Sequence, residues 1–302
     1  MPPMTSKVDG HSCQAQVPET LDLAARGALA LHALAGGLDH DNEYQVLGGG
    51  ECGGVKLGAK FAEAFTAMRV MSGSDYALDV EEGLMQALLA NLGEDGLLYT
   101  PADTVKGRVS DRGYEAADED YTDPCANGRM MLAMMYRYQL DQDPVWPRRI
   151  RKMVAGLASM AQHSDDYAYF PEGGATSEFA YLKQSGYRDA SEPQREHVGP
   201  EGSVFDNANH PIRALSQWYQ MSGDRQALEL ASKIAKWLLK PVYWVEGDDI
   251  DIVGPERARW DGHFHGHMIA FRSLLWYAEV SNHRRVKELV RSAYEYALSF
   301  GL

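Results

Sequence analysis

The sequence has few cysteines, no excess of positive charge and no long apolar run, and each shortage excludes a class of protein. Its three cysteines (Cys13, Cys52 and Cys125) are odd in number and lack paired spacing, which argues against a disulfide framework and against a cysteine-rich zinc site. The formal net charge is −14, and no basic run offsets it, so we expect no nucleic-acid partner. The apolar runs are far shorter than the roughly 20 residues of a membrane span, so we expect no membrane partner.

The start of the chain also lacks the basic and then apolar layout of a secretion signal, and we therefore expect a soluble, cytoplasmic protein. Residues 1–17 are polar and aperiodic, which predicts a disordered N-terminal tail. From residue 18 the pattern becomes helical, and a hydrophobic content of 45% in 302 residues supports a substantial core. We expect one domain over residues 18–302.

One plan is repeated four times along the chain. An apolar helix ends in a short polar turn, and a second, amphipathic helix follows. The turns begin at Ser72, Asp141, Ser222 and Ser281, and a further helix over residues 21–34 comes first. Because the first helix of each pair is apolar nearly all round, we expect these inner helices to be buried among one another and the outer helices to face solvent.

This repeat predicts an all-α fold, most simply a toroid of helical hairpins of the (α/α)6 type, with an open solenoid as the alternative. Four hairpins and the leading helix make nine helices, whereas a ring of six hairpins has twelve. Either the ring is incomplete and a partner supplies the missing helices, or the chain is part of a longer protein, which we favour. The pattern does not indicate an oligomeric state.

Polar side chains gather where the inner helices of the last three hairpins are expected to begin. If neighbouring inner helices are parallel, the three groups meet at one end of a central funnel. We expect Pro211 to take the first position of its helix. The groups are, in chain order, Glu119, Tyr121, Asp123 and Asn127; Asp206, Asn207, Asn209, His210 and Arg213; and Trp260, Asp261, His263, His265 and His267.

Such a funnel suits cleavage of a glycosidic bond, which needs two carboxyl groups and neighbours that hold sugar hydroxyls. Helix N-termini also favour ionised carboxylates. We expect Asp206 and Asp261 to be catalytic, then Asp123, with His265 as a further catalytic candidate, and we assign substrate binding to the other residues of the three groups. The simpler interpretation of Asp123 and Asp206 is that they are N-caps or turn residues.

The three histidines allow two geometries. In an extended segment His263, His265 and His267 point the same way and could bind a metal ion together with Asp261, whereas in a helix only His263 and His267 share a face. Substrate contact and helix capping are the alternatives. We expect no bound metal and no other cofactor.

Three features resemble the six-hairpin glycosidase superfamily. They are the units of helix, SGD-type turn and helix, the DGLLY segment at residues 95–99, and the GHFHGHMIAFRSLLWYAEVSNHRR stretch at residues 262–285. These segments are similar to bacterial proteins related to the beta-L-arabinofuranosidase and unsaturated-glucuronyl hydrolase groups. The resemblance implies an (α/α)6 fold and a substrate derived from an oligosaccharide or polysaccharide. It also implies a cysteine-rich zinc centre for the arabinofuranosidase group, which the cysteines here do not reproduce.

Other functions stay open. N-acylglucosamine 2-epimerase-like proteins use a similar toroid with histidines that transfer protons, so His210 and the histidines at 263–267 would be the acid–base set of a sugar epimerase or isomerase. Polysaccharide lyases use Tyr or His as a base. A non-catalytic helical-repeat scaffold would carry apolar patches in place of the Asp, His and Asn groups.

Overall fold

The computed structural model describes residues 22–47, 54–102, 119–174, 179–198, 202–244 and 264–298, and most of them are helical. The chain divides into two compact units, one made of residues 1–116 and 129–153 (unit 1) and the other of residues 117–128 and 154–302 (unit 2). The predicted tail at residues 1–17 lies outside the described residues. None of the described helices is long and apolar enough to cross a membrane.

The predicted leading helix and the four predicted helical pairs are all present, which confirms the all-α class. The leading helix is α2 (Leu23–Gly36). The pairs are α3 (Gly54–Ser72) with α4 (Leu78–Ala90), α5 (Pro124–Asp141) with α6 (Val145–Met160), α7 (Val204–Ser222) with α8 (Arg225–Leu238), and α9 (Phe264–Val280) with α10 (Arg284–Leu298).

Short polar side chains and a glycine determine where several of these helices begin and end. The carboxylate of Asp22 accepts a hydrogen bond from the Ala25 amide and caps α2. Asp224 caps α8 in the same way, accepting from the amides of Gln226 and Ala227. Gly223 ends α7 in the left-handed conformation (φ 73°), which costs a glycine little.

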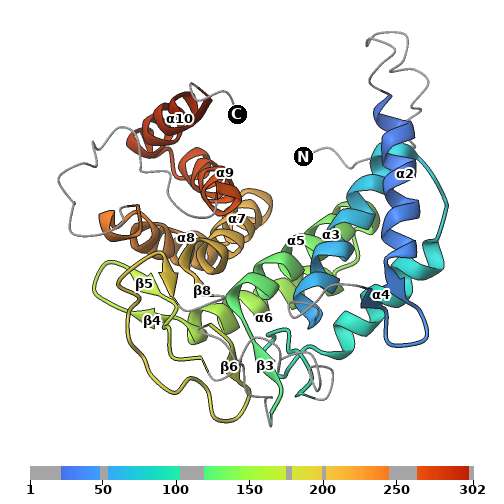
Figure 1. Cartoon of the computed structure of the whole chain (residues 1–302), viewed down its shortest axis with the longest axis horizontal. Helices are drawn as coiled ribbons and strands as arrows, with labels where there is room; N and C mark the ends of the chain where they lie inside the picture. The colour runs from blue at the N-terminus through green and yellow to red at the C-terminus, as the bar shows by residue number, and fades with distance from the viewer. Residues whose placement is uncertain are drawn as a thin grey trace. The chain divides into compact units, whose positions relative to one another are not determined.

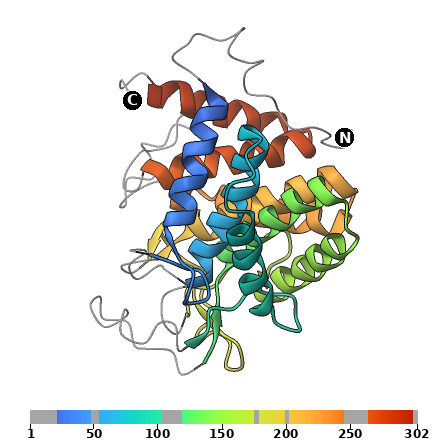
Figure 2. The same ribbon diagram turned by 90° about the vertical axis from the view of Figure 1, so that its right-hand side faces the viewer.

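In unit 1, α2 packs against α3 and α3 packs against α4 (Figure 2). Leu31, Ala59 and Phe65 are fully buried in this part of the chain. The strands β1 (Leu38–Asp39) and β2 (Gln45–Val46) pair antiparallel and close the loop after α2. The first hairpin therefore has its own apolar core.

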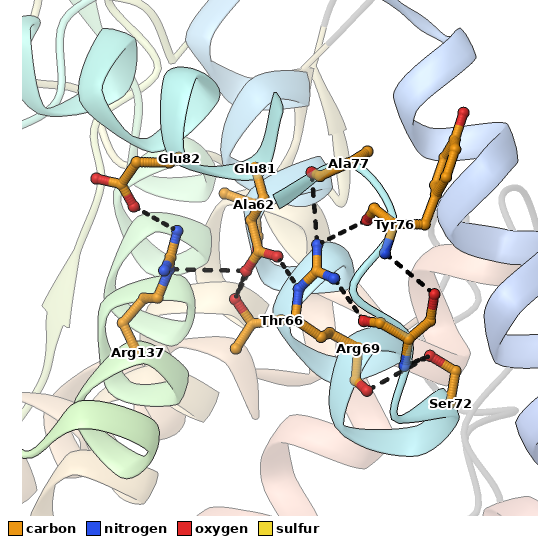
Figure 3. A network of polar contacts seen from close by, with 10 residues as sticks. Ala62, Thr66, Arg69, Ser72, Tyr76, Ala77, Glu81, Glu82 and Arg137 are labelled. Carbon is orange, nitrogen blue, oxygen red and sulfur yellow. Dashed lines mark hydrogen bonds and ion pairs between the residues drawn. The ribbon is translucent and has the colours of Figure 1, made fainter. Parts of the chain in front are cut away.

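A buried ion-pair network joins the two helices of that hairpin (Figure 3). Glu81 is only 3% exposed, and its carboxylate accepts hydrogen bonds from Thr66 Oγ1 at 2.9 Å and from Arg69 Nε at 2.5 Å. Arg137 Nε lies 3.7 Å from the same carboxylate. Arg69 also donates to carbonyl oxygens of the α3–α4 turn, those of Ser74, Tyr76 and Ala77. The network thus stabilises the turn as well as the helix pair.

In unit 2, α7 packs against both α8 and α9, and α9 packs against α10 (Figure 1). Nearly every side chain of α7 from Val204 to Ser216 is buried, whereas α8 buries one face. The buried residues of α8 are Ala227, Leu230, Ala231, Ile234, Ala235, Trp237 and Leu238. This difference confirms the inner and outer positions predicted for the third hairpin.

Short antiparallel strands of two residues each occur in the connections of unit 2. The pairs are β3 (Tyr121–Thr122) with β6 (Tyr181–Leu182), β4 (Gln162–His163) with β5 (Ala168–Tyr169), and β7 (His197–Val198) with β8 (Gly202–Ser203). The connections into α5 and α7 are therefore held by backbone hydrogen bonds.

The structure corrects where two inner helices begin. Pro211 lies well inside α7, so its prediction as a first helical residue is wrong. The reason is that Ser203 caps the helix much earlier, and burial of the added turns outweighs the one backbone hydrogen bond that a proline removes. Likewise, α9 already begins at Phe264. Polar residues expected before these helices are therefore inside their first turns.

Candidate active site

Gly128, the fifth residue of α5, lies directly against the backbone of α7 about two turns from its start, within unit 2. A Cβ atom built on Gly128 would lie 2.4 Å from the carbonyl carbon of His210 and 2.5 Å from the nitrogen of Pro211. Only a residue without a side chain allows this approach. The first and second polar groups are thereby brought together.

The first turns of α7 and α9 are also in contact. Asn209 Nδ2 donates a hydrogen bond to the carbonyl of Gly266 at 3.4 Å. The rings of Phe205 and His267 meet edge to face, with centroids 4.7 Å apart. Three helix N-termini, with their partial positive charge, therefore lie beside one another in unit 2.

Asp206 is the carboxylate in this region that is best placed to meet a ligand. It lies in the first turn of α7, where its amide donates to Ser203 Oγ at 3.2 Å, and its side chain is half-buried. Within the described part of the chain, its carboxylate makes no hydrogen bond and no ion pair. Asp206 is thus fixed through its backbone, and its carboxylate has no partner among the described residues.

Asp123 and Asn127 hold the start of α5. Asp123 is 9% exposed, and its Oδ1 accepts a hydrogen bond from the Ala126 amide at 2.7 Å, as the capping interpretation predicts. Asn127 is fully buried, and its Nδ2 donates to Thr122 Oγ1 at 2.7 Å and to the Asp123 carbonyl at 2.8 Å. A catalytic role of Asp123 and a substrate-binding role of Asn127 stay predictions.

His265 and His267 lie in the first turn of α9, and their environments differ. His265 is exposed, whereas His267 is buried between the rings of Phe205 and Trp244. Because this segment is helical, the extended arrangement of the histidines is wrong for these two residues. His265 is therefore the histidine of the described α9 turn that solvent can reach.

Glu119 is engaged by a neighbouring turn. Its carboxylate accepts hydrogen bonds from the amides of Gln184 and Ser185 at 2.9 and 3.2 Å, and from Ser185 Oγ at 2.5 Å. The bond from Ser185 and then that from Gln184 lower the pKa of Glu119. Tyr121 is half-buried in β3 next to this turn, where it pairs with Leu182.

Of the other residues predicted for the site, some are buried and the rest lie outside the described residues. Asn207 is buried and donates from Nδ2 to the Ser203 carbonyl at 3.0 Å. His210 and Arg213 are buried in α7. Trp260, Asp261 and His263 lie outside the described residues, so the separation of Asp206 and Asp261 stays a prediction.

One residue beside Asp206 was not identified from the sequence. Glu196 Oε1 accepts a hydrogen bond of 2.5 Å from the hydroxyl of Ser203, the N-cap of α7. The signal was the GPEG segment at residues 199–202, which is typical of a tight turn. The pairing of β7 with β8 returns the chain to the start of α7 and brings Glu196 with it.

The described residues do not fit a cysteine-rich zinc centre. Among them, no three or more His, Cys, Asp or Glu side chains are grouped closely enough to hold a metal ion. Cys125 is buried in the first turn of α5, and Cys13 and Cys52 lie outside the described residues. We therefore derive no chemical step through a metal.

These helical hairpins define an all-α domain of the (α/α)6 type, with polar groups at the N-termini of its inner helices. The fold is similar to that of a GH76 alpha-mannanase from Bacteroides thetaiotaomicron, solved as a selenomethionine derivative, with a TM-score of 0.53 and 11% sequence identity. The match covers 80% of this chain, and the chain spans 56% of the mannanase chain.

Residues 86–251, more than half of the chain, match the model of the beta-L-arabinofuranosidase, GH127 catalytic domain family. The chain belongs to this family. No curated protein matches it. The matched residues include the first and second polar groups, from Glu119 to Arg213.

Proposed function

We propose that the chain is part of a glycoside hydrolase that cleaves an arabinofuranoside or a related sugar from an oligosaccharide or polysaccharide. The observation that carries this proposal is the half-buried carboxylate of Asp206, which makes no hydrogen bond or ion pair with the described residues and lies among three adjoining helix N-termini in a chain of the GH127 family. Family membership does not favour an isomerase, a lyase or a scaffold.

Chemically, Asp206 suits the role of an ionised carboxylate. The helix N-terminus favours its negative charge, so it can act as a base or stabilise the positive charge that develops on the sugar ring. The reaction also needs a second carboxyl group to protonate the leaving oxygen. We propose Asp261 for that role, and exposed His265 as a group that contacts the sugar hydroxyls.

The substrate class is proposed from the family name and the polar groups together. Carboxylates, amides and imidazoles offer the hydrogen bonds that sugar hydroxyls require. A pentofuranoside is the first substrate to test. An alpha-mannan belongs in the same panel because the structurally similar enzyme is an alpha-mannanase.

The experiment compares the purified protein with an Asp206→Asn variant on 4-nitrophenyl β-L-arabinofuranoside and on alpha-mannan. We expect the wild-type protein to hydrolyse the substrate. For the variant we expect kcat to fall by roughly 10²–10⁴-fold, because general acid–base catalysis typically contributes a factor of this size. Asparagine has almost the same shape, so the thermal midpoint should stay within about 1 °C.

The matched control is Asp166→Asn, which neutralises an exposed aspartate that pairs with Lys236 at 3.6 Å. It should leave kcat unchanged. Full activity in Asp206→Asn would remove Asp206 from the mechanism, and absence of hydrolysis by the wild-type protein on glycosides of every class tested would refute the proposed function.

A further inference from the structure

The connection before α7 folds back on itself immediately in front of Asp206. Strands β7 and β8 pair His197 with Ser203 and Val198 with Gly202. The amide of Val204 donates to the carbonyl of Glu196 at 2.9 Å, which extends the pairing by one step. Glu196 is thereby held beside the first turn of α7, although it is ten residues from Asp206 in sequence.

Ser203 links these two acidic residues. Its hydroxyl is buried, donates its proton to Glu196 Oε1 at 2.5 Å and accepts from the Asp206 amide at 3.2 Å. A serine hydroxyl has only one proton, so donation to Glu196 fixes the direction of its lone pairs. A hydrogen bond to a carboxylate is about twice as strong as one between neutral groups. Glu196 therefore determines how Ser203 meets the Asp206 amide.

We propose that Glu196 is a positioning residue for Asp206 and acts through Ser203. The inference rests on the proposed function, because it concerns the orientation of the carboxylate assigned to catalysis. A serine N-cap alone satisfies the helix end. The added carboxylate holds the cap in one rotamer, and with it the backbone from which the Asp206 side chain projects. Misplacement of a reacting group by about 1 Å can cost 10²-fold in rate.

The test uses Glu196→Ala, Glu196→Gln and Ser203→Ala in the full chain, with 4-nitrophenyl β-L-arabinofuranoside as the probe. Alanine removes the acceptor, whereas glutamine keeps an oxygen at the same position. We expect Glu196→Ala and Ser203→Ala to lower kcat by about 10- to 100-fold, with KM within about twofold. We expect Glu196→Gln to recover kcat to within about threefold of the wild-type value.

A purely structural role would give a different pattern. If Glu196→Ala keeps the wild-type kcat, or if Glu196→Gln is as poor as Glu196→Ala, the proposal is overturned. The matched control is Glu229→Ala on the exposed surface of α8, where the glutamate pairs with Lys233 at 3.4 Å. It should leave kcat and KM at their wild-type values.

A second measurement needs no enzymatic activity. The Asp206 amide is one of the first N–H groups of α7 and has no intrahelical acceptor, so Ser203 Oγ accounts for its protection from hydrogen exchange. Glu196→Ala should speed exchange at this amide by about tenfold, and Glu196→Gln should not. If exchange at the Asp206 amide is faster in Glu196→Ala but not in Glu196→Gln, while the wild-type protein hydrolyses no glycoside, the proposed function fails and the coupling of Glu196 to Asp206 stands. Unchanged exchange in Glu196→Ala overturns the coupling itself.

Discussion

Replacing Gly128 with alanine tests whether the contact between α5 and α7 assembles the candidate site. The added methyl group would lie 2.4 Å from the carbonyl carbon of His210, whereas ordinary contacts of this kind begin at 3.4 Å. The neighbouring atoms belong to the backbone and cannot rotate away. The first turn of α5 must therefore move by about 1 Å relative to α7, and Asp123 and Asn127 must move with it.

Two opposing effects set the stability change. Alanine favours a helix over glycine by about 1 kcal/mol. Overpacking against backbone costs about 1–3 kcal/mol. We expect the steric cost to prevail, with a net loss of about 1–2 kcal/mol and a fall in Tm of roughly 2–8 °C. If Asp123 and Asn127 belong to the active site, kcat should also fall by up to about 10²-fold.

Thermal unfolding followed by circular dichroism measures the first effect, and hydrolysis of 4-nitrophenyl β-L-arabinofuranoside measures the second. Gly36→Ala is the matched control, because a Cβ atom built on this last residue of α2 has nothing within 4 Å. The control should be neutral or slightly stabilising. If Gly128→Ala is as stable as the control, α5 and α7 do not approach each other closely enough at Gly128 for a methyl group to clash, and the contact does not assemble the site.

Three further changes test other parts of the structure. Glu81→Ala should destabilise unit 1 by about 3–5 kcal/mol in urea unfolding, because it leaves Arg69 without its buried carboxylate; a loss under about 1 kcal/mol would contradict the network in Figure 3. Asp224→Ala should cost about 1 kcal/mol through loss of the α8 cap, and an unchanged midpoint would show that the cap contributes nothing. The folded-state pKa of Glu119 lies below its ordinary value of 4.5, so its stabilisation of the 183–185 turn is complete above that pH and is lost as the pH falls through the folded-state pKa. The protection factor of the Gln184 amide, which is the intrinsic exchange rate divided by the observed rate, should therefore fall in acid, and an equal acid response in Glu119→Gln would contradict this assignment.

The repeated helical pairs could be predicted because apolar periodicity and polar turns are local signals. The first residue of each helix was harder to predict. Pro211 was predicted as the first residue of its helix, but Ser203 caps α7 much earlier. Asn207, Asn209 and His210 between them are buried by neighbouring helices that a single sequence does not reveal. The polar groups were expected before the apolar helices, and the described ones of the second and third groups lie inside the N-terminal parts of α7 and α9; their role as a site stays a prediction.

The individual roles in the site depend on contacts between residues far apart in sequence. Glu119 meets Ser185, 66 positions along the chain, and no local pattern predicts that bond. Glu196 reaches Ser203 only because β7 and β8 pair. The catalytic and substrate-binding roles, the single domain over residues 18–302 and the cytoplasmic location stay predictions.

The burial of α7 on nearly every side limits how proteins of this kind can change. A substitution in its first three turns is felt by both α8 and α9, so most variation there should be lost through poor folding before it can alter specificity. New sugar preferences are then expected to arise in the connections, where residues can be inserted or exchanged without repacking a helix. Among members of the family, we therefore expect the buried residues of the helices to vary slowly. The loops that connect the helices should vary most, in step with the sugar that each protein uses.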